Sequence, residues 1–443
     1  MASYEISRRG LLKGMAATSA LWALPAYAGM SRHTSGPPLR KPGSRPFANV
    51  PAGTDMLPQI EHIVVVMMEN HSFDNYFGML GRGDGFTLDR RGQPTAVNDD
   101  SSGNPVRAYH APSTCQSHYD VSQSWTASHT AWDYGRMDGF VRGSSRDAMA
   151  YWTGADLPYY YDLGRTFVLC DRYFASTMAQ TYPNRRFLMA ATALGQVSDP
   201  LPSPTDPAPP NGTIFDRLNA YGISWKNYFV DLATCMLFPS VPESNPQHLA
   251  PTAQFFVDAA AGTLPGFCIV DTEFNQASEE NPQDIQTGEE FAARVINAAL
   301  TGAAWDKTLL IWTYDEHGGY YDHVRPPRAV PPDGIPPQVT QTYGDLYSYY
   351  GLRVPTVVVS PYARKDYVSH VVHDHTSILK LVETKFNLPA LTNRDANADN
   401  LLDSLDFDNA PAFLTPPSLP KSHNVDGVTA LCSAAGPVPN PNG

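Results

Sequence analysis

The chain has 443 residues, of which 42% are hydrophobic and 17% charged, and its formal net charge is −13. This composition excludes a disordered chain and a coiled coil, and the acidic balance argues against broad nucleic-acid binding, which requires basic surface. No uninterrupted apolar run reaches about 18 residues, so we expect no permanent membrane span.

The N-terminus has the order of parts found in an export signal. Arg8 and Arg9 precede a modestly apolar run, which leads into a small-residue A-x-A segment ending at Ala28. Paired arginines ahead of such a run are typical of twin-arginine export. We therefore predict a signal peptide at 1–28, passage through the twin-arginine export machinery, and a mature protein in the periplasm or outside the cell.

Composition divides the rest of the chain into three parts. Residues 29–56 are rich in Pro and Gly and are predicted to be a linker. Residues 57–408 contain the apolar runs and are predicted to form one domain. Residues 409–443 hold many prolines and few periodic apolar residues, which predicts a C-terminal tail.

Short apolar runs within the predicted domain indicate buried strands. They lie at 63–68, 166–170, 266–270, 308–313 and 355–359. Continuous apolar strands are buried on both faces, and helical patterns such as 289–299 separate some of them. This alternation predicts an α/β fold with a mainly parallel sheet and helices on both faces. In such folds ligands bind beyond the carboxyl ends of the strands.

Oxygen-bearing side chains follow two of these strands directly. Glu69 and Asn70 come after the first strand, and Asp315 and Glu316 closely follow the fourth. Carboxylate and amide oxygens suit Ca²⁺, Mg²⁺ or Mn²⁺, and carboxylates also bind Zn²⁺. The sequence thus predicts one divalent metal ion of open identity. The alternative is that these groups cap helices or pair with arginines.

A candidate nucleophile precedes a helix-like run at 187–194. Pro183 is suited to a first helical position, which would place Thr181 just ahead of the helix N-terminus. Free N–H groups there favour an anion, and a hydroxyl that loses its proton can attack phosphorus. A threonine near a helix N-cap is the common alternative.

The five cysteines form no C-x-x-C pair, so a zinc ribbon is not expected. Cys170 and Cys268 lie in apolar runs and are predicted to be buried thiols. One disulfide among Cys115, Cys235 and Cys432 is compatible with export, and the sequence leaves its pairing open.

Six segments, in order from about residue 60 to 385, resemble the bacterial phosphoesterase family. That family contains C-type phospholipases and a group of acid phosphatases, and it belongs to the alkaline phosphatase superfamily. The segments are 62–74, 137–140, 181–185, 288–289, 314–324 and 373–377. The resemblance implies an alkaline-phosphatase-like three-layer sandwich, a phosphoesterase catalytic domain at 57–408, and hydrolysis of a phosphoric ester.

The resemblance also implies roles for individual residues. The metal would be held by Glu69, Asn70, Asp315 and Glu316. Thr181 would attack phosphorus and form a phospho-enzyme that water later opens. Either His375, which we favour, or His373 would contact the phosphate or protonate the leaving group.

Three further residues receive supporting roles from the resemblance. Asp322 and His323 would orient the groups that bind the metal or substrate. Arg185 would shape the helix turn rather than touch substrate.

Two positions depart from the family pattern. Asn281 stands where members usually have a His before a proline, and Gln123 stands where members have a His two residues before Trp125. Asn and Gln can bind a phosphate but cannot shuttle protons near neutral pH. His118 or His129 could substitute; otherwise a different rate, pH optimum or substrate would follow.

The leading hypothesis is a phospholipase C-like enzyme that cleaves a phosphodiester, with a phospholipid as one candidate substrate. An acid phosphatase acting on monoesters is the alternative, and a non-catalytic phosphate-ester-binding protein is a second one, motivated by the two replaced histidines. Thr181, Pro183 and Arg185 also have the spacing of the sulfatase motif. Sulfatases need an aldehyde made from Cys or Ser, which Thr cannot yield.

Overall fold

The computed structural model describes residues 39–423 and Cys432. The signal peptide predicted at 1–28 lies outside the described residues, as do 29–38 and most of the chain after 423. One compact unit begins at Lys41, and the fold and the site described below belong to it.

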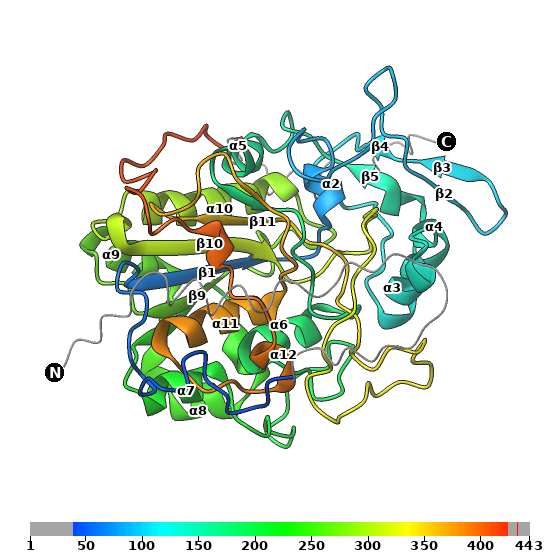
Figure 1. Cartoon of the computed structure of the whole chain (residues 1–443). Coiled ribbons are helices and arrows are strands. Elements are labelled where there is room, and N and C mark those ends of the chain that lie inside the picture. The colour runs from blue at the N-terminus through cyan, green and yellow to red at the C-terminus, as the bar shows by residue number, and fades with distance from the viewer. Residues whose placement is uncertain (1–38, 424–431, 433–443) are drawn as a thin grey trace, which may run out of the picture. The chain divides into compact units, whose positions relative to one another are not determined.

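An eight-stranded sheet forms the middle of this unit (Figure 1). Its strands, in spatial order, are β12 (Val368–Ser369), β6 (Val168–Cys170), β11 (Thr356–Val359), β10 (Thr308–Tyr314), β1 (His62–Met68), β9 (Phe267–Asp271), β7 (Trp225–Phe229) and β8 (Leu249–Pro251). All neighbouring pairs are parallel except those of β11, which runs antiparallel to both β10 and β6. The predicted mainly parallel sheet is confirmed.

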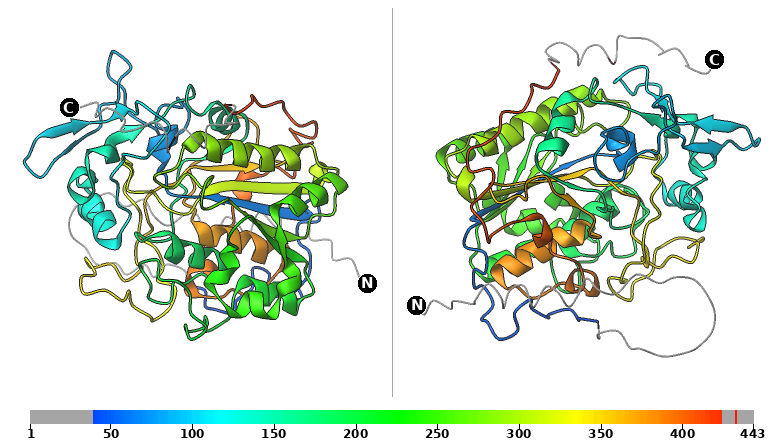
Figure 2. Two further views of the ribbon diagram at one scale, coloured as in Figure 1. Left: turned by 180° about the vertical axis from the view of Figure 1, so that it is seen from behind. Right: turned by 45° about the horizontal axis from the view of Figure 1, so that its top comes forward.

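Helices cover both faces of the sheet (Figures 1 and 2). On one face lie α5 (Pro158–Thr166), α9 (Thr252–Ala261) and α10 (Ile285–Leu300). On the other lie α6 (Thr181–Ala190), α7 (Ile214–Ala220), α11 (His375–Phe386) and α12 (Asn393–Ala396). The three-layer α/β arrangement expected from the strand–helix alternation is therefore confirmed.

The two central strands explain why the sheet sits at the core. Every residue of β1 and of β10 is buried. Their runs of Val, Met, Leu and Ile have no polar face, so each strand requires a helix layer on both sides. They pair in parallel with Met68 opposite Tyr314. The residues that follow the two strands must therefore emerge side by side.

A smaller group of elements lies beside the sheet, to the right in Figure 1. It contains α3 (Trp125–Trp132), α4 (Phe140–Gly143) and the hairpin of β2 (Val97–Asp99) and β3 (Pro105–Arg107). Trp132, Met137 and Phe140 belong to its apolar cluster. Short elements complete the fold: α2 (Phe73–Phe77), β4 (Tyr109–His110), β5 (Ala150–Tyr151) and α8 (Ser240–Ser244).

Two helices begin earlier than the sequence predicted. The helix expected at 289–299 starts at Ile285, because the side chain of Asp284 accepts a hydrogen bond from the Gln286 N–H and caps it. The helix expected to begin near Pro183 starts at Thr181. Thr181 is thus the first helical residue rather than one ahead of the helix, and Pro183 lies within the first turn, where its missing N–H costs nothing.

Two features anchor the ends of the described chain. The N–H groups of Gly53 and Met56 donate to the backbone of Phe386 and Lys385, so residues 41–56 run along the end of α11. Cys115 and Cys432 form a disulfide. The predicted burial of Cys170 and Cys268 is confirmed, and Cys235 is a third buried free thiol. None of the described helices is both long and apolar enough to cross a bilayer.

Candidate active site

The carboxyl ends of β1 and β10 bring Asn70 and Asp315 together. The Asn70 N–H donates to Oδ1 of Asp315 at 3.3 Å. Asn70 has a φ of 68°, a left-handed conformation that Asn tolerates better than most residues. Gly318 passes so close that a Cβ there would lie 1.9 Å from the carbonyl oxygen of Asn70. The glycine lets the loop after β10 fold over the end of β1.

Thr181 faces this strand-end pair from the N-terminus of α6. Its Oγ1 donates to Oδ1 of Asn70 at 3.3 Å, and the residue is 5% exposed. The Asn184 side chain shapes the preceding turn by accepting from the Thr177 N–H and donating to the Ala179 carbonyl. One N–H of the helix terminus is already used, since the Tyr182 N–H donates to Asp199 at 2.7 Å.

Arg185, one turn further along α6, binds the strand ends from inside the protein. Its Nε donates to Oδ2 of Asp315 at 2.9 Å, and one terminal nitrogen donates to the Met68 carbonyl at 3.2 Å. The guanidinium also lies 3.7 Å from Glu69 and 3.6 Å from Asp271. Arg185 is 1% exposed, so it is a buried positive charge among three carboxylates, and its contacts extend beyond the helix turn that the resemblance implied for it.

The site carries more buried acid than buried base. Burial raises the pKa of Glu69 well above its usual value, against the opposing charge of Arg185. Burial and the charge of Asp315 do the same to the pKa of Glu316. Oε1 of Glu316 and Nδ2 of Asn70 are buried without a hydrogen-bond partner. The site has several oxygen atoms that can act as metal ligands, including a carboxylate oxygen without a hydrogen bond. This set is of the kind that binds a divalent cation.

The side chains are not gathered around one point, however. Within the described part of the chain, groups of three His, Cys, Asp or Glu ligand atoms within 4.8 Å of one another occur at Asp74–Asp322–His323 and at His373–Asp399–Asp403. Glu69, Asp315 and Glu316 do not form such a group. Arg185 lies against Glu69 and Asp315 and supplies the local positive charge.

His375 lies against the site with both ring nitrogens engaged. Its Nε2 is 2.7 Å from the Asp315 carbonyl, and its Nδ1 is 3.3 Å from the Tyr173 hydroxyl. Because a carbonyl only accepts, Nε2 carries the proton and Nδ1 accepts from Tyr173. Burial lowers the pKa of His375. In this arrangement the imidazole is neutral and holds the Asp315 backbone in place.

His373 is directed elsewhere. Its ring nitrogens lie 3.4 Å from Asp399 and 3.2 Å from Asp403. The structure therefore brings His375, but not His373, to the candidate site.

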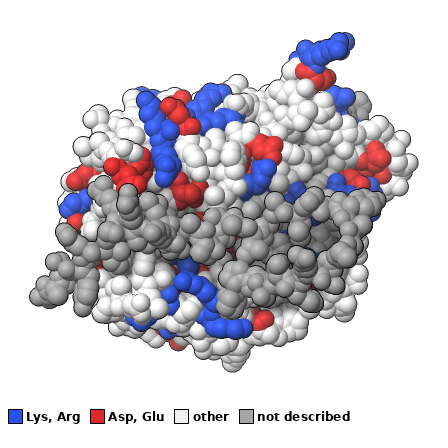
Figure 3. Space-filling model, in the orientation of Figure 1, with Lys and Arg blue, Asp and Glu red and all other residues white. Residues whose placement is uncertain are grey.

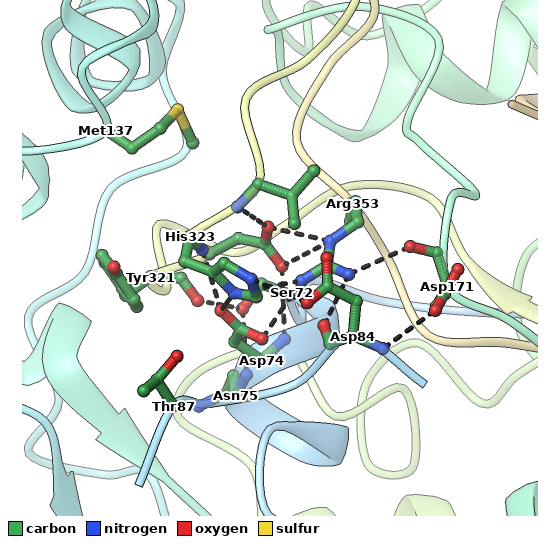
Figure 4. A network of polar contacts seen from close by, with 12 residues as sticks. Ser72, Asp74, Asn75, Asp84, Thr87, Met137, Asp171, Tyr321, His323 and Arg353 are labelled. Atoms are coloured by element: carbon green, nitrogen blue, oxygen red, sulfur yellow. Dashed lines mark hydrogen bonds and ion pairs between the residues drawn. The ribbon is translucent and has the colours of Figure 1, made fainter. Parts of the chain in front are cut away.

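Asp322 and His323 belong to a buried ionic network around Arg353 (Figure 4). Arg353 donates from Nε to Asp322 at 2.9 Å and from a terminal nitrogen to Asp74 at 3.1 Å. His323 Nδ1 lies 2.6 Å from Asp74. Burial opposes protonation of His323, but the hydrogen bond and charge of Asp74 outweigh it and raise its pKa to about 9. The guanidinium of Arg353 already provides the positive charge next to Asp74 and Asp322. The network therefore links the loops after β1 and β10 rather than offering a metal site.

The two positions that depart from the family pattern make their hydrogen bonds to residues other than Thr181. Asn281 donates to the Tyr119 carbonyl and accepts from the Tyr320 hydroxyl. The backbone carbonyl of Gln123 accepts from Ser128. His129 lies 2.7 Å from the Trp125 carbonyl and 3.3 Å from Asp345, which holds it inside the α3 region.

Residues that the sequence interpretation passed over also border the site. Asp271, the last residue of β9, lies near Arg185 and accepts a 2.7 Å hydrogen bond from the Thr234 N–H. Burial and then the charge of Asp315 raise the pKa of Glu280 to about 7. His317 lies 3.1 Å from Glu316, and its Nε2 has no partner. Asp271 directly follows the predicted strand 266–270, so the strand-end rule was sufficient to find it.

A hollow of about 340 Å³ opens beside the residue that precedes Thr181. Its lining includes Gln180, Ser198, Gln341 and the Trp125 side of α3, and it contains no charged residue. Thr181 itself does not line the hollow, whose neutral, partly aromatic wall is suited to an uncharged group rather than to an anionic one.

The phosphoesterase family model matches residues 60–389, which include every strand-end residue of the site. The chain belongs to the phosphoesterase family. Phospholipase C B of Mycobacterium tuberculosis is 30% identical to this chain, and the alignment covers 82% of this chain and 80% of the phospholipase. Non-specific phospholipase C1 of Arabidopsis thaliana is also 30% identical, covering 82% and 74%. The predicted family is confirmed.

The comparison with solved structures matches an alkaline phosphatase superfamily protein from Vibrio parahaemolyticus, with a TM-score of 0.41 and 10% identity, over 91% of this chain and 80% of that chain.

Proposed function

We propose that this phosphoesterase is an exported hydrolase of the phospholipase C type, which cleaves a phosphodiester by attack of Thr181 on phosphorus. The observation that carries the proposal is the buried contact of Thr181 with Asn70 at the shared end of β1 and β10. The relatives named phospholipase C support the reaction class.

The chain's own groups suit the steps of this reaction. Oδ1 of Asn70 accepts a hydrogen bond from the Thr181 hydroxyl and thereby orients the hydroxyl oxygen. Attack forms a bond between Oγ1 of Thr181 and phosphorus and breaks the bond from phosphorus to the alcohol oxygen. The hydroxyl proton of Thr181 passes to solvent, and the departing alcohol oxygen takes up a proton from solvent; water then cleaves the phospho-enzyme and restores the Thr181 hydroxyl. Arg185 and His375 hold Asp315 from two sides. A divalent ion held by Glu69, Asn70, Asp315 and Glu316 would neutralise charge that develops on the phosphoryl oxygens.

One observation is compatible with a diester that carries a neutral or zwitterionic substituent: the hollow lined by Gln180 has no charged lining residue. On the face seen in Figure 3, positive and negative side chains are interspersed in the coloured part. An acid phosphatase acting on monoesters is the second candidate, supported by the family resemblance.

The test compares p-nitrophenylphosphorylcholine with p-nitrophenyl phosphate for the wild type, Thr181→Ala and Thr181→Ser. We expect preference for the diester, a loss on the order of 10³-fold or more in Thr181→Ala, and partial activity in Thr181→Ser. Thr177→Ala is the matched control, because its buried hydroxyl makes no hydrogen bond. Preference for the monoester would make the chain a phosphatase, and full activity in Thr181→Ala would exclude the nucleophile.

Lipid products identify the bond that is cleaved. Phosphatidylcholine should yield diacylglycerol and phosphocholine. Export is tested by fractionating cells that produce either the full wild-type chain or the variant with both Arg8→Lys and Arg9→Lys. The variant should stay in the cytoplasm.

A further inference from the structure

A second cluster of ligand-type side chains lies where the loop before α11 meets the segment after α12. His373 comes from that loop, and Asp399 and Asp403 come from the segment. One ligand atom of each lies within 4.8 Å of the other two. Within the described part of the chain, these three side chains make no hydrogen bond or ion pair to Thr181 or to the carboxylates around it, so the cluster is separate from the candidate active site.

The imidazole of His373 is buried, and only its Nε2 makes a hydrogen-bond contact, with the Ser369 hydroxyl at 3.3 Å. The side chain is 0% exposed, and its Nδ1 has no hydrogen-bond partner although Oδ1 of Asp399 lies 3.4 Å away. Oδ1 of Asp403 is likewise without a partner, 3.2 Å from Nε2. A nitrogen and an oxygen of the cluster, Nδ1 of His373 and Oδ1 of Asp403, are therefore buried without a hydrogen bond.

The two carboxylates are held from outside the cluster. Oδ2 of Asp403 accepts from the Ser369 hydroxyl at 2.5 Å and from the Tyr367 hydroxyl at 3.2 Å. Oδ1 of Asp399 accepts from the Leu401 N–H at 3.0 Å. Such outer contacts orient metal ligands in proteins. The Asp399 and Asp403 side chains are 28% and 21% exposed, which leaves room for water to complete a coordination shell.

We propose that His373, Asp399 and Asp403 bind a divalent transition-metal ion, with Zn²⁺ as the first choice, and that this ion ties the segment after α12 to the start of α11. One imidazole with two carboxylates suits Zn²⁺ or Mn²⁺ better than Ca²⁺ or Mg²⁺, which prefer oxygen alone. The site has a structural role and does not depend on the proposed phosphodiesterase activity.

The test uses Zn²⁺ with chelator-treated mature protein, measuring bound metal by elemental analysis and calorimetric titration, and the midpoint of thermal unfolding with and without Zn²⁺. The key variant is Asp399→Asn, whose amide oxygen can still accept from the Leu401 N–H. Asp406→Asn is the matched control, because Asp406 also accepts turn N–H groups, from Asp408 and Asn409. His373→Gln provides a second variant.

Wild type and Asp406→Asn should each bind one more equivalent of Zn²⁺ than Asp399→Asn and His373→Gln, and only the first two should gain thermal stability from Zn²⁺. Glu316→Gln should keep this equivalent, which separates it from metal at the candidate active site. Equal stoichiometry and equal stabilisation in wild type and Asp399→Asn would overturn the proposal. Zn²⁺ binding by the wild type only at millimolar concentrations would overturn it as well.

Discussion

The Nε of Arg185 donates to Oδ2 of Asp315 over 2.9 Å, which joins the helix that begins with Thr181 to the loop after β10. Replacing Arg185 by Met would leave Glu69, Asp271 and Asp315 buried around no positive charge. We expect Arg185→Met to lose about 3–5 kcal/mol of unfolding free energy and phosphodiesterase activity with it. Arg185→Lys keeps the charge and should lose less.

Urea unfolding and kcat measured on the folded fraction check this prediction. Arg294→Met, at an exposed arginine of α10, is the control and should change neither quantity appreciably. Wild-type stability in Arg185→Met would show that the three acids do not need the guanidinium.

Metal removal should abolish the enzymatic activity reversibly. After chelator treatment, phosphodiester turnover should fall to background and return with one of Ca²⁺, Mg²⁺, Mn²⁺ or Zn²⁺. Glu316→Gln should raise the metal concentration needed for half activity by roughly 10- to 100-fold, because the unpartnered Oε1 is a free ligand atom. Glu243→Gln, on the exposed surface, is the control. Chelator-resistant turnover in the wild type would contradict metal dependence.

His323 should make stability depend on pH. Its pKa is about 9 in the folded protein and near 6.5 when unfolded. The folded state therefore holds the proton more tightly, and the stabilisation is full below pH 6.5 and lost as pH rises to about 9. Since the ring is about a third exposed, we expect a loss of about 1–2 kcal/mol after allowance for screening.

Urea unfolding at pH 6 and pH 9.5 measures this loss. The loss of unfolding free energy between these two pH values should be about 1–2 kcal/mol smaller in His323→Gln than in the wild type. It should be unchanged in His370→Gln, whose side chain is 70% exposed. If the unfolding free energy of His323→Gln and of the wild type changed equally with pH, groups other than His323 would cause the change.

Gly288 should not tolerate a methyl group. A Cβ there would lie 2.1 Å from Cγ of Glu279. Glu279 cannot move aside easily, because its carboxylate accepts hydrogen bonds from three buried hydroxyls, those of Tyr76, Tyr160 and Tyr314. We expect Gly288→Ala to lower the free energy of unfolding by about 1–3 kcal/mol. Gly334→Ala is the matched control, since nothing lies within 4 Å of its added Cβ; equal stability of the two variants would refute the prediction.

Reduction of the Cys115–Cys432 disulfide should lower the unfolding midpoint. The bond closes a loop across 317 residues, so its removal should cost about 3–5 kcal/mol of stability by releasing the unfolded chain. Cys115→Ser should unfold at the same midpoint with and without reductant. Cys235→Ser retains the disulfide and should still respond to reductant.

The sequence predicted the central part of the fold because runs such as 63–68 and 308–313 are apolar throughout and allow only a doubly covered strand. It missed β7 because Trp225–Phe229 includes Lys and Asn, so only the structure shows that Trp225, Asn227 and Tyr228 of this strand are buried. It misplaced the start of α6 because Pro183 suits several positions in a first turn. The reversed direction of β11 follows from tertiary pairing, which local propensity does not encode.

For the site, strand ends were a sound guide, and Asn70, Asp315 and Thr181 are indeed neighbours. The separation of His373 from His375 could not be predicted, because the two residues flank Asp374 and lie at the entry of a helix, where neighbouring side chains point in different directions. Arg185 also looked like a turn residue in the sequence, since its partners are on strands far away in the chain.

The pairing of β1 with β10 has a consequence for protein synthesis. Glu69 and Asn70 are made early, yet Asp315 and His375 that complete their surroundings are made more than half a chain later. A ribosome-bound chain therefore has no assembled reactive centre until α11 has emerged. Any truncated product that ends before β10 should bind neither metal nor phosphate ester at the candidate active site. Activity should therefore arise only when synthesis of the chain is nearly complete.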